Sequence, residues 1–370
     1  MMINRTTYLA LLLLAAALWS CSQEPVEEPV PPRVEAHPVG FLVDGNLSKG
    51  VVTTHKDSIY SLGLIGYSTE DSFDIKAKTS DPNLFDNVTA YREEIGGVSW
   101  IYDQPVYWPS NSALKNTFFA YSPYQDEFPD ESITIVTDKG SPRIIYSVPE
   151  AMSEHTDLLY SVYNTDVANI NYTEQNRGTV KLNMKHALLW LRFMIAAEKQ
   201  SGHADEAYTV TEFNMTAGRI INTGLFDMAT ATWYSIPELP NGEYESVNYD
   251  FDNLEDEPLV VKADSMYPMG GVSYDHCLMI IPQSIVLSEN ETAVNVAFTY
   301  DTGLEDDPEK DIERYITMPF PDVKLNKPGY VMTFIVKLST EGARITFHSS
   351  NPIAEWLEEE DDPLREIETY

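Results

Sequence analysis

Short runs that alternate between apolar and polar residues recur along the chain. Val180–Met184 and Val294–Tyr300 place apolar side chains at every second position, which is typical of a strand buried on one face. Ile133–Val136 is a shorter run of the same kind, and Tyr330–Leu338 is almost wholly apolar, as in a central strand. Turn residues such as Lys327-Pro328-Gly329 separate the runs. The pattern predicts an all-β protein built from β-sandwiches.

One segment, residues 185–198, fits either a helix or a strand. Trp190, Phe193 and Ile195 follow another alternating run, and this context favours a strand. The polar, Asn-rich stretch from Tyr163 to Gly178 is the best candidate for a domain boundary. We therefore predict an N-terminal β-sandwich over residues 37–166 and a C-terminal β-sandwich over residues 167–357.

The N-terminus has the pattern of a lipoprotein signal peptide. A single cation, Arg5, precedes an uncharged stretch from Tyr8 to Trp19, which is shorter than a membrane-spanning helix. Leu18-Trp19-Ser20-Cys21 resembles the site where bacteria acylate a cysteine and cleave before it, although Trp19 stands where a small residue is usual. We expect residues 1–20 to be removed and Cys21 to carry lipid. The alternative is a plain secretory peptide in which Cys21 is incidental.

Residues 21–36 form a Pro- and Glu-rich tether. Its prolines lack the N–H that a helix or sheet needs, so we expect an extended linker. Acidic residues just after the cysteine resemble the surface-export signal of lipoproteins in Gram-negative gut and oral anaerobes. The sequence thus predicts a protein anchored by lipid to the outer membrane and exposed on the cell surface; the alternative is an ordinary linker and a periplasmic protein.

The other end of the given sequence is acidic, and we interpret residues 358–370 as an acidic tail.

Charge and composition limit the possible partners. The chain has 24 Lys and Arg against 58 Asp and Glu, a net charge of -34, which repels phosphate backbones and excludes nucleic-acid binding. At 43% hydrophobic residues it is nonetheless too apolar to be disordered.

Motifs that would indicate catalysis or a cofactor are missing from the sequence. It has no His-Glu-x-x-His, Gly-x-Ser-x-Gly, phosphate loop or Cys-x-x-Cys, and no two histidines stand at metal-ligand spacing. Cys277 lies in an apolar run and is read as a buried thiol rather than a nucleophile. Asn248–Asn253 alternates oxygen ligands as a calcium loop does, but it lacks the expected Gly and Glu, so we interpret it as an acidic loop. We expect no enzyme activity, no metal and no cofactor.

A set of short motifs, in order along the chain, resembles the fimbrillin family, whose members are surface lipoproteins that build or decorate pili. The motifs are Trp100–Pro109, Phe118–Pro123, His186-Ala187-Leu188, Met279–Gln283, Gly329-Tyr330 and Ile353–Trp356. The resemblance implies two transthyretin-like Greek-key β-sandwiches in tandem.

Aromatic residues are concentrated in the first two of these motifs. The sequence predicts that they form a cluster in the core of the first sandwich, because they recur at strand spacing beside Pro105 and Pro109. The alternative is an exposed platform that stacks on carbohydrate. The predicted cluster consists of Trp100, Tyr102, Tyr107, Trp108, Phe118, Phe119 and Tyr121.

The resemblance also implies assembly by strand addition, in which an Arg-directed protease removes an early strand and the next subunit fills the groove. Here Arg33 is the only arginine between Cys21 and Arg92, so trimming at Arg33 would release the lipid but no strand. The carboxylates that follow Trp356 make the C-terminus a poor donor strand. We therefore expect an anchor, tip or accessory subunit that joins other fimbrial subunits, or an adhesin for an unidentified surface receptor. The alternative is a glycan-binding lipoprotein for nutrient capture.

Two tripeptides, Asp57-Ser58-Ile59 and Asp264-Ser265-Met266, resemble the O-glycosylation signal of the same bacteria. They make Ser58 and Ser265 candidate modification sites.

Overall fold

The fold is built from strands. The computed structural model describes residues 36–44, 59–76, 81–92, 99–138, 140–198, 207–218, 220–236, 247–251, 254, 258–263, 265–269, 278–284, 292–301 and 311–352. Their regular structure consists of strands and two short 3₁₀ helices, η2 (Gln125–Glu127) and η3 (Met152–Glu154), with no α-helix in these ranges. The protein is therefore all-β, which confirms the prediction from the alternating pattern.

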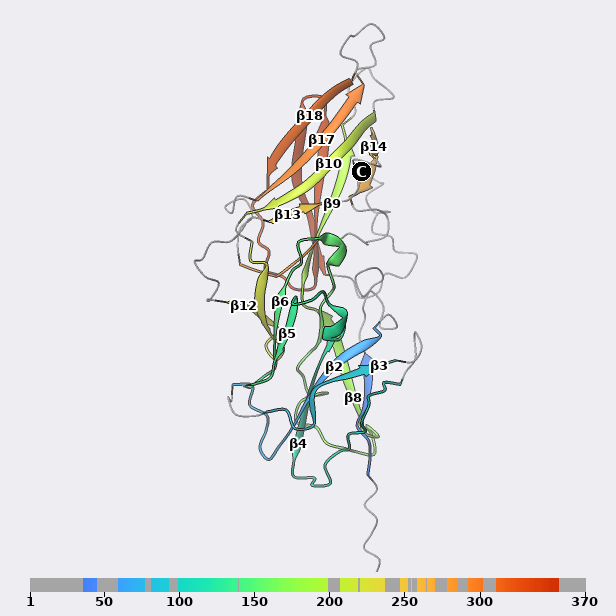
Figure 1. Ribbon diagram of the computed structural model, residues 1–370, viewed down its shortest axis with the longest axis vertical. Coiled ribbons are helices and arrows are strands. Elements are labelled where there is room, and N and C mark those ends of the chain that lie inside the picture. The colour runs from blue at the N-terminus through green and yellow to red at the C-terminus, as the bar shows by residue number, and fades with distance from the viewer. Residues whose placement is uncertain are drawn as a thin grey trace, which may run out of the picture. The chain divides into compact units, whose positions relative to one another are not determined.

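Of the four sheets that the described strands form, two contain the first of these strands (Figure 1). The six-stranded sheet has the order β1 (Gly40–Asp44), β8 (Thr179–His186), β7 (Leu159–Ser161), β4 (Lys115–Ser122), β2 (Ser61–Thr69) and β3 (Phe85–Tyr91). The four-stranded sheet has the order β12 (Thr232–Ser235), β11 (Thr223–Asp227), β6 (Arg143–Ser147) and β5 (Ile133–Val136).

The other two sheets take their strands from the second half of the chain. The β9 sheet has the order β15 (Met266–Pro268), β9 (Leu189–Ala197), β19 (Tyr330–Ser339) and β20 (Gly342–Pro352), and β16 (Leu278–Ile280) also pairs with β9. The β10 sheet has the order β13 (Val247–Asp250), β10 (Ala207–Ala217), β17 (Ala293–Asp301) and β18 (Asp311–Pro319), and β14 (Leu259–Lys262) also pairs with β10. Within the described strands, β1 with β8 and β9 with β19 are the parallel pairs.

The strand pairing does not follow the boundary predicted at residue 166. β8 comes after that position but pairs with β1 and β7, and β11 pairs with β6. The predicted boundary segment, residues 163–178, also packs against the six-stranded sheet, since Val167 is buried there and its carbonyl accepts the N–H of Phe118. The polarity of residues 163–178 indicated a domain boundary, but long-range pairing, which polarity does not encode, decides which strands share a sheet. The transthyretin-like connectivity stays a prediction.

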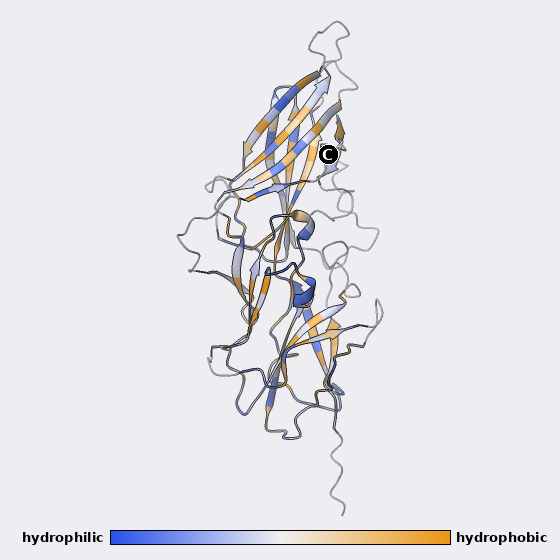
Figure 2. Cartoon of the chain, in the orientation of Figure 1, coloured by the Kyte–Doolittle hydropathy of each residue, from blue (hydrophilic) through white to orange (hydrophobic). Residues whose placement is uncertain are grey.

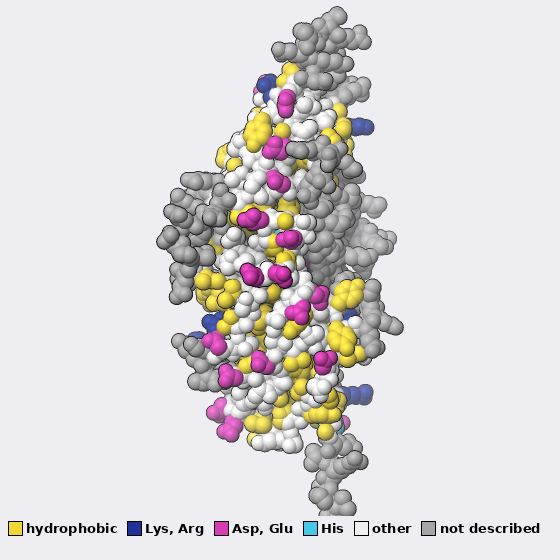
Figure 3. All heavy atoms as spheres, in the orientation of Figure 1, with side chains coloured by type: hydrophobic (Ala, Val, Ile, Leu, Met, Phe, Trp, Pro, Cys, Tyr) yellow, Lys and Arg dark blue, Asp and Glu magenta, His cyan; other side chains and the backbone are white. Residues whose placement is uncertain are grey.

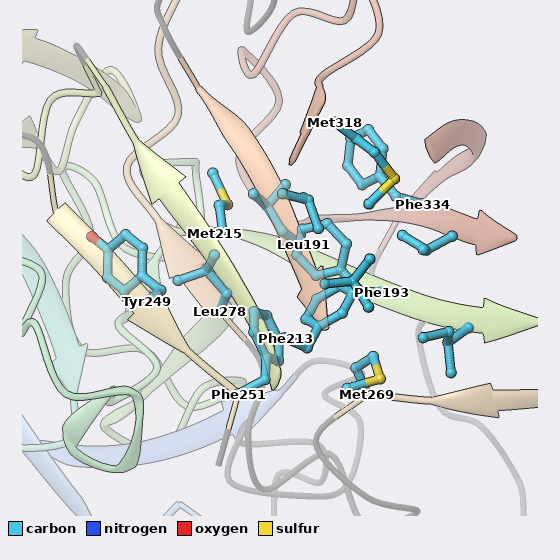
Figure 4. Close-up of a cluster of buried hydrophobic side chains, with 14 of the residues drawn as sticks. Leu191, Phe193, Phe213, Met215, Tyr249, Phe251, Met269, Leu278, Met318 and Phe334 are labelled. Atoms are coloured by element: carbon cyan, nitrogen blue, oxygen red, sulfur yellow. The ribbon is translucent and has the colours of Figure 1, made fainter. Parts of the chain in front are cut away.

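Three large clusters of buried side chains hold the described sheets together. The β9–β10 core lies between the β9 sheet and the β10 sheet, and Phe193 is central to it, with ring centroids 5.5 Å from Phe213, 5.2 Å from Phe251 and 5.7 Å from Phe334 (Figure 4). The β6 core lies between the six-stranded and four-stranded sheets and includes Ile144, Tyr146, Phe119 and Tyr121. The β1 core, on the other face of the six-stranded sheet, includes Val39, Phe41, Val43, Phe85, Trp100, Trp108 and Phe118.

The period-two pattern explains why these segments are strands. Along β8 every second residue is buried, from Val180 to His186, while Lys181, Asn183 and Lys185 face solvent. The same alternation of colours is visible along the strands in Figure 2. β9 is buried on both faces, and it is the strand that we predicted in place of a helix over residues 185–198. β19 pairs on both sides, with β9 and β20, as its nearly continuous apolar run predicted.

Within the residues that the structure describes, we find no helical segment with the length and hydrophobicity that a membrane crossing would need.

Candidate functional site

The first described strand, β1, is seated at the edge of the six-stranded sheet. It pairs in parallel with β8, from Gly40 opposite Thr179 to Asp44 opposite Asn183. Val39, Phe41 and Val43 are all buried in the β1 core, whereas Leu42 between them is 38% exposed. Apolar residues at every second position of this edge strand therefore fill a groove whose walls come from the rest of the chain.

Aromatic rings form the walls of this groove. The ring of Phe41 meets Phe85 edge-on at 5.4 Å, Phe118 at 5.9 Å and Tyr102 at 6.4 Å between centroids. Edge-to-face pairs of this kind stabilise a core beyond the area they bury, by about 0.5–1.5 kcal/mol each. Phe41 is thus the main anchor of β1.

Backbone hydrogen bonds hold the residues just before β1. Val39 N–H donates to Val106 O at 2.9 Å, and Trp108 N–H donates to His37 O at 2.9 Å. The hydroxyl of Tyr102 donates to Val39 O at 2.6 Å, and burial raises the pKa of this hydroxyl, which keeps its proton in place. Residues 99–109 therefore clamp the entry to β1.

Gly178, directly before β8, allows residues 99–109 to pack closely against this part of the chain. The φ angle of Gly178 is +76°, and its carbonyl accepts the indole N–H of Trp108 at 3.0 Å. A Cβ at this position would lie 2.9 Å from Pro38 O and 3.0 Å from Trp108 Nε1. Only glycine combines this backbone conformation with so close a contact.

The seven aromatic residues of the predicted cluster do not share one core. Trp100, Trp108 and Phe118 lie in the β1 core, and Phe119 and Tyr121 lie in the β6 core, because successive residues of β4 point to opposite faces. Tyr102 is half-buried against the β1 core. Tyr107 is 46% exposed, so its assignment to the core is wrong. It lies next to buried Trp108 in the chain and therefore points outward, and sequence spacing alone did not show which of the two faces the core.

Four other candidate residues have different outcomes. Cys21, Arg33 and Ser58 lie outside the described residues, so their roles stay predictions. Ser265 is half-buried directly before β15, and its N–H donates to Lys262 O at 3.2 Å. O-glycosylation at Ser265 also stays a prediction.

Two buried histidines lie near β7; sequence reasoning named His186 only as part of a family motif and did not name His155. His186 Nδ1 lies 2.7 Å from Asp157 Oδ2, and both side chains are buried. His155 accepts the N–H of Met279 at Nδ1, 3.2 Å away, and its Nε2 lies 2.9 Å from Pro149 O, which places the proton on Nε2. These bonds tie the segment before β7 to β8 and β16. No group of three or more His, Cys, Asp or Glu in the described part of the chain is placed to hold a metal ion.

The fimbrillin-like family model matches residues 61–348. The chain belongs to the fimbrillin-like family. Family membership places this fimbrillin-like protein at the cell surface or in a pilus, with a fimbrial or adhesive role.

The fold is shared with a solved structure. A fimbrial protein from Bacteroides vulgatus ATCC 8482 is similar with a TM-score of 0.69 and 18% identity, over 86% of this chain and 100% of that chain. The tip fimbrial protein Mfa3 from Porphyromonas gingivalis, with a C-terminal truncation, is similar over 85% of this chain and 99% of that chain, with a TM-score of 0.37 and 8% identity. No curated protein sequence matches the chain.

Proposed function

We propose that this fimbrillin-like protein is an anchor, tip or accessory subunit of a fimbria, or a surface adhesin, rather than a stalk subunit. Membership of the family supports association with other fimbrial subunits. The finer assignment rests on one observation, which is the position of β1 relative to the arginines of the sequence.

Strand addition needs an empty groove, and the β1 groove is filled by the chain's own residues. A donor strand from another subunit gains backbone hydrogen bonds along an edge and inserts alternate side chains into pockets. Here Phe41 and its neighbours already occupy those pockets. A second subunit can use this groove only after β1 has left it.

The arginines do not allow an Arg-directed protease to remove β1. Arg33 precedes the strand, and no arginine lies between it and Arg92. Arg92 is 9% exposed, and its guanidinium carbon lies 4.5 Å from the ring centroid of Trp100. Cleavage at Arg33 therefore separates the chain from Cys21 and leaves β1 in the same fragment as its groove.

The C-terminal sequence supports the same proposal. Leu357 is followed by five consecutive carboxylates, from Glu358 to Asp362, and then by Pro363. Placing ionised carboxylates in an apolar groove costs several kcal/mol each unless they are paired. This segment is thus unsuited to fill the groove of a neighbouring subunit.

Acylation of Cys21 would hold the protein at the outer membrane. The test is metabolic labelling with a fatty acid in wild type and in Cys21→Ala. We expect label only in the wild type, and equal labelling of both would contradict the lipid anchor.

The assembly proposal is tested by digestion with an Arg-specific protease. We compare wild type with Lys56→Arg, which places a cleavage site between β1 and β2, and with Lys56→Gln as the matched control. A labelled peptide of residues 36–44 reports an open groove. We expect only Lys56→Arg to lose β1, detected by mass spectrometry, and to bind the peptide.

Wild type and Lys56→Gln should remain monomeric in size-exclusion chromatography after digestion. Extended polymers formed by digested wild type would contradict the proposal, because they would show that the groove opens without release of β1.

A role in nutrient capture through the predicted aromatic cluster is not supported. That role needs an exposed row of rings, whereas Trp100, Trp108, Phe118, Phe119 and Tyr121 are all buried.

A further inference from the structure

The outer face of the β10 sheet carries an exposed ring beside a fixed set of polar groups. Figure 3 views the molecule from the side on which β13, β10, β17 and β18 lie in front (compare Figure 1). Apolar residues of these strands point inward to the β9–β10 core, so the alternate residues make up the outer face.

Two adjacent cross-strand rows define what we call the Tyr315 face. The first row places Asp250, Asn214, Asn295 and Thr317 opposite one another on β13, β10, β17 and β18. The second row places Glu212, Ala297 and Tyr315 opposite one another on β10, β17 and β18. The rows are two residues apart along each strand, or about 7 Å.

Tyr315 is the most exposed of the large hydrophobic side chains on the described surface, at 59%. Its cross-strand neighbour is Ala297, whose methyl group is too small to cover a phenol ring. No hydrogen bond is made by the Tyr315 hydroxyl within the described part of the chain. An aromatic body and an unused polar end are thus both open to a ligand.

The polar groups beside the ring are held in place by one another. Asn295 Nδ2 donates to Asn214 Oδ1 at 2.7 Å and to Thr216 Oγ1 at 3.1 Å, and Thr317 Oγ1 donates to Asn295 Oδ1 at 2.8 Å. Asn214 Nδ2 in turn donates to Glu212 Oε1 at 2.7 Å. Asn214 and Asn295 are only 5% and 8% exposed, so the network is fixed before any ligand binds. Fixed groups lose little conformational entropy on binding.

The charges on this face select against anionic ligands. Its two rows contain the carboxylates of Glu212 and Asp250 and no Lys or Arg, and Glu313 lies on the same face of β18 beside Tyr315. Carboxylates accept hydroxyl protons strongly but repel sulfate, phosphate and sugar acids. A surface with an exposed aromatic ring and hydroxyl-accepting groups beside it matches a chain of uncharged sugars, whose C–H faces can stack on a ring while their hydroxyls bond to acceptors.

We propose that the Tyr315 face binds an uncharged glycan chain. This inference rests on the proposed place of the protein at the cell surface and gives the adhesive role a class of ligand. The sugar ring stacks on Tyr315, and its hydroxyls bond to Thr317, Glu212 and Asp250. A polar network that served only the stability of the sheet would not need the exposed ring beside it.

The test is binding of the full chain, purified in mild detergent, to an array of neutral, sialylated and sulfated glycans. Variants are Tyr315→Ala, Tyr315→Phe, and the control Tyr234→Ala, which removes a ring that is 49% exposed on β12 of a different sheet. We expect wild type to bind neutral glycans. Tyr315→Ala should weaken this binding about tenfold or more, which is the usual effect of truncating a tyrosine that a bound ligand covers. Tyr315→Phe should retain binding to within about threefold of wild type, because the ring carries most of the contact.

Several results would overturn the inference. They are the absence of neutral-glycan binding, wild-type binding by Tyr315→Ala, an equal loss in Tyr234→Ala, or a preference for sulfated or sialylated glycans. A wild-type dimer that dissociates in Tyr315→Ala would show instead that a second copy covers this face. Binding by purified protein needs neither a lipid anchor nor a fimbria, so failure on the array leaves the proposed subunit role intact, and failure of that role leaves the array result standing.

Discussion

Tyr107 and Trp108 are neighbours in the chain with opposite surroundings. Trp108 is 7% exposed, its ring lies 5.6 Å from that of Phe118, and its indole N–H is hydrogen-bonded to Gly178 O. Tyr107 is 46% exposed. The pair therefore offers a comparison of a buried and an exposed aromatic residue in one segment.

Truncation of these two residues should have very different effects. We expect Trp108→Ala to lower the free energy of unfolding by about 3–5 kcal/mol, because it leaves a cavity in the β1 core. Tyr107→Ala should change it by about 0.5 kcal/mol or less. Urea denaturation measures both free energies, and similar losses in the two variants would contradict the burial of Trp108 and the exposure of Tyr107.

A glycine on β2 lies under a tyrosine ring of β4. A Cβ at Gly63 would come within 2.0 Å of Tyr121 Cε1, and Tyr121 is fully buried in the β6 core. We expect Gly63→Ala to destabilise the protein by about 1–3 kcal/mol, because the ring must move into occupied space. The double variant Gly63→Ala/Tyr121→Leu should lose less than the sum of the two single losses in thermal unfolding. Additive losses would show that the two side chains do not compete for this space.

At the scale of the element, β1 is a strand whose two faces have different roles. Its inward residues fill the β1 core, and Leu42 faces solvent. Because β1 pairs with a single neighbour, β8, among the described strands, its stability depends strongly on the side chains that anchor it.

Removal of the main anchor should loosen this strand. We expect Phe41→Ala to lower the free energy of unfolding by about 3–5 kcal/mol and to speed amide hydrogen exchange in residues 40–44 more than in β9. Leu42→Ala is the matched control and should change neither by much. Uniform acceleration of exchange across the chain by Phe41→Ala would contradict a local role for this anchor.

The sequence was largely sufficient to predict which segments form strands, but not which strands pair with one another. Burial at alternate residues of β8 is set by a local pattern, and so is the strand character of β9. The parallel pairing of β1 with β8 joins residues about 140 positions apart, and nothing in the pattern of either segment specifies the other. For the same reason the predicted boundary separated β8 and β11 from the sheets that contain them.

At the scale of the whole molecule, the buried tyrosines should make the folded state less stable at alkaline pH. Burial, with a smaller contribution from the charge of Glu150, raises the pKa of Tyr249 from its ordinary value of 10.0 to about 12. Burial also raises the pKa of Tyr67, Tyr121 and Tyr146. In the unfolded chain these hydroxyls ionise near their ordinary pKa, while in the folded chain they keep their protons to higher pH.

The contribution of these tyrosines to the free energy of unfolding should therefore be fully present below about pH 10. It should fall as pH rises from about 10 towards 12, because the unfolded state loses protons that the folded state retains. Urea denaturation at a series of pH values measures this slope, and tyrosinate absorbance should appear together with unfolding. Tyr249→Phe should make the slope shallower. A free energy of unfolding that stays constant through this range would contradict the burial of these hydroxyls.

As with the fold, one part of the candidate sites was predictable from the sequence and another part was not. Sequence reasoning named four aromatic residues that lie in or against the β1 core, because large rings at strand spacing are concentrated in a short part of the sequence; these are Trp100, Tyr102, Trp108 and Phe118. It did not name Phe41 or Phe85. It did not identify the Tyr315 face, because Glu212, Asn295 and Tyr315 are ordinary outward-facing strand residues when each is taken alone. Cross-strand register brings them together.

The sequence by itself determined the all-β class, the resemblance to fimbrillins and the acidic character of the protein, because each depends on local period, short motifs or composition. Only the tertiary structure decided which strands share a sheet, that Phe118 and Phe119 face different cores, and that Tyr107 faces solvent. These features arise from contacts between residues far apart in the chain. The free energy of such contacts depends on how whole sheets pack, which no single segment encodes.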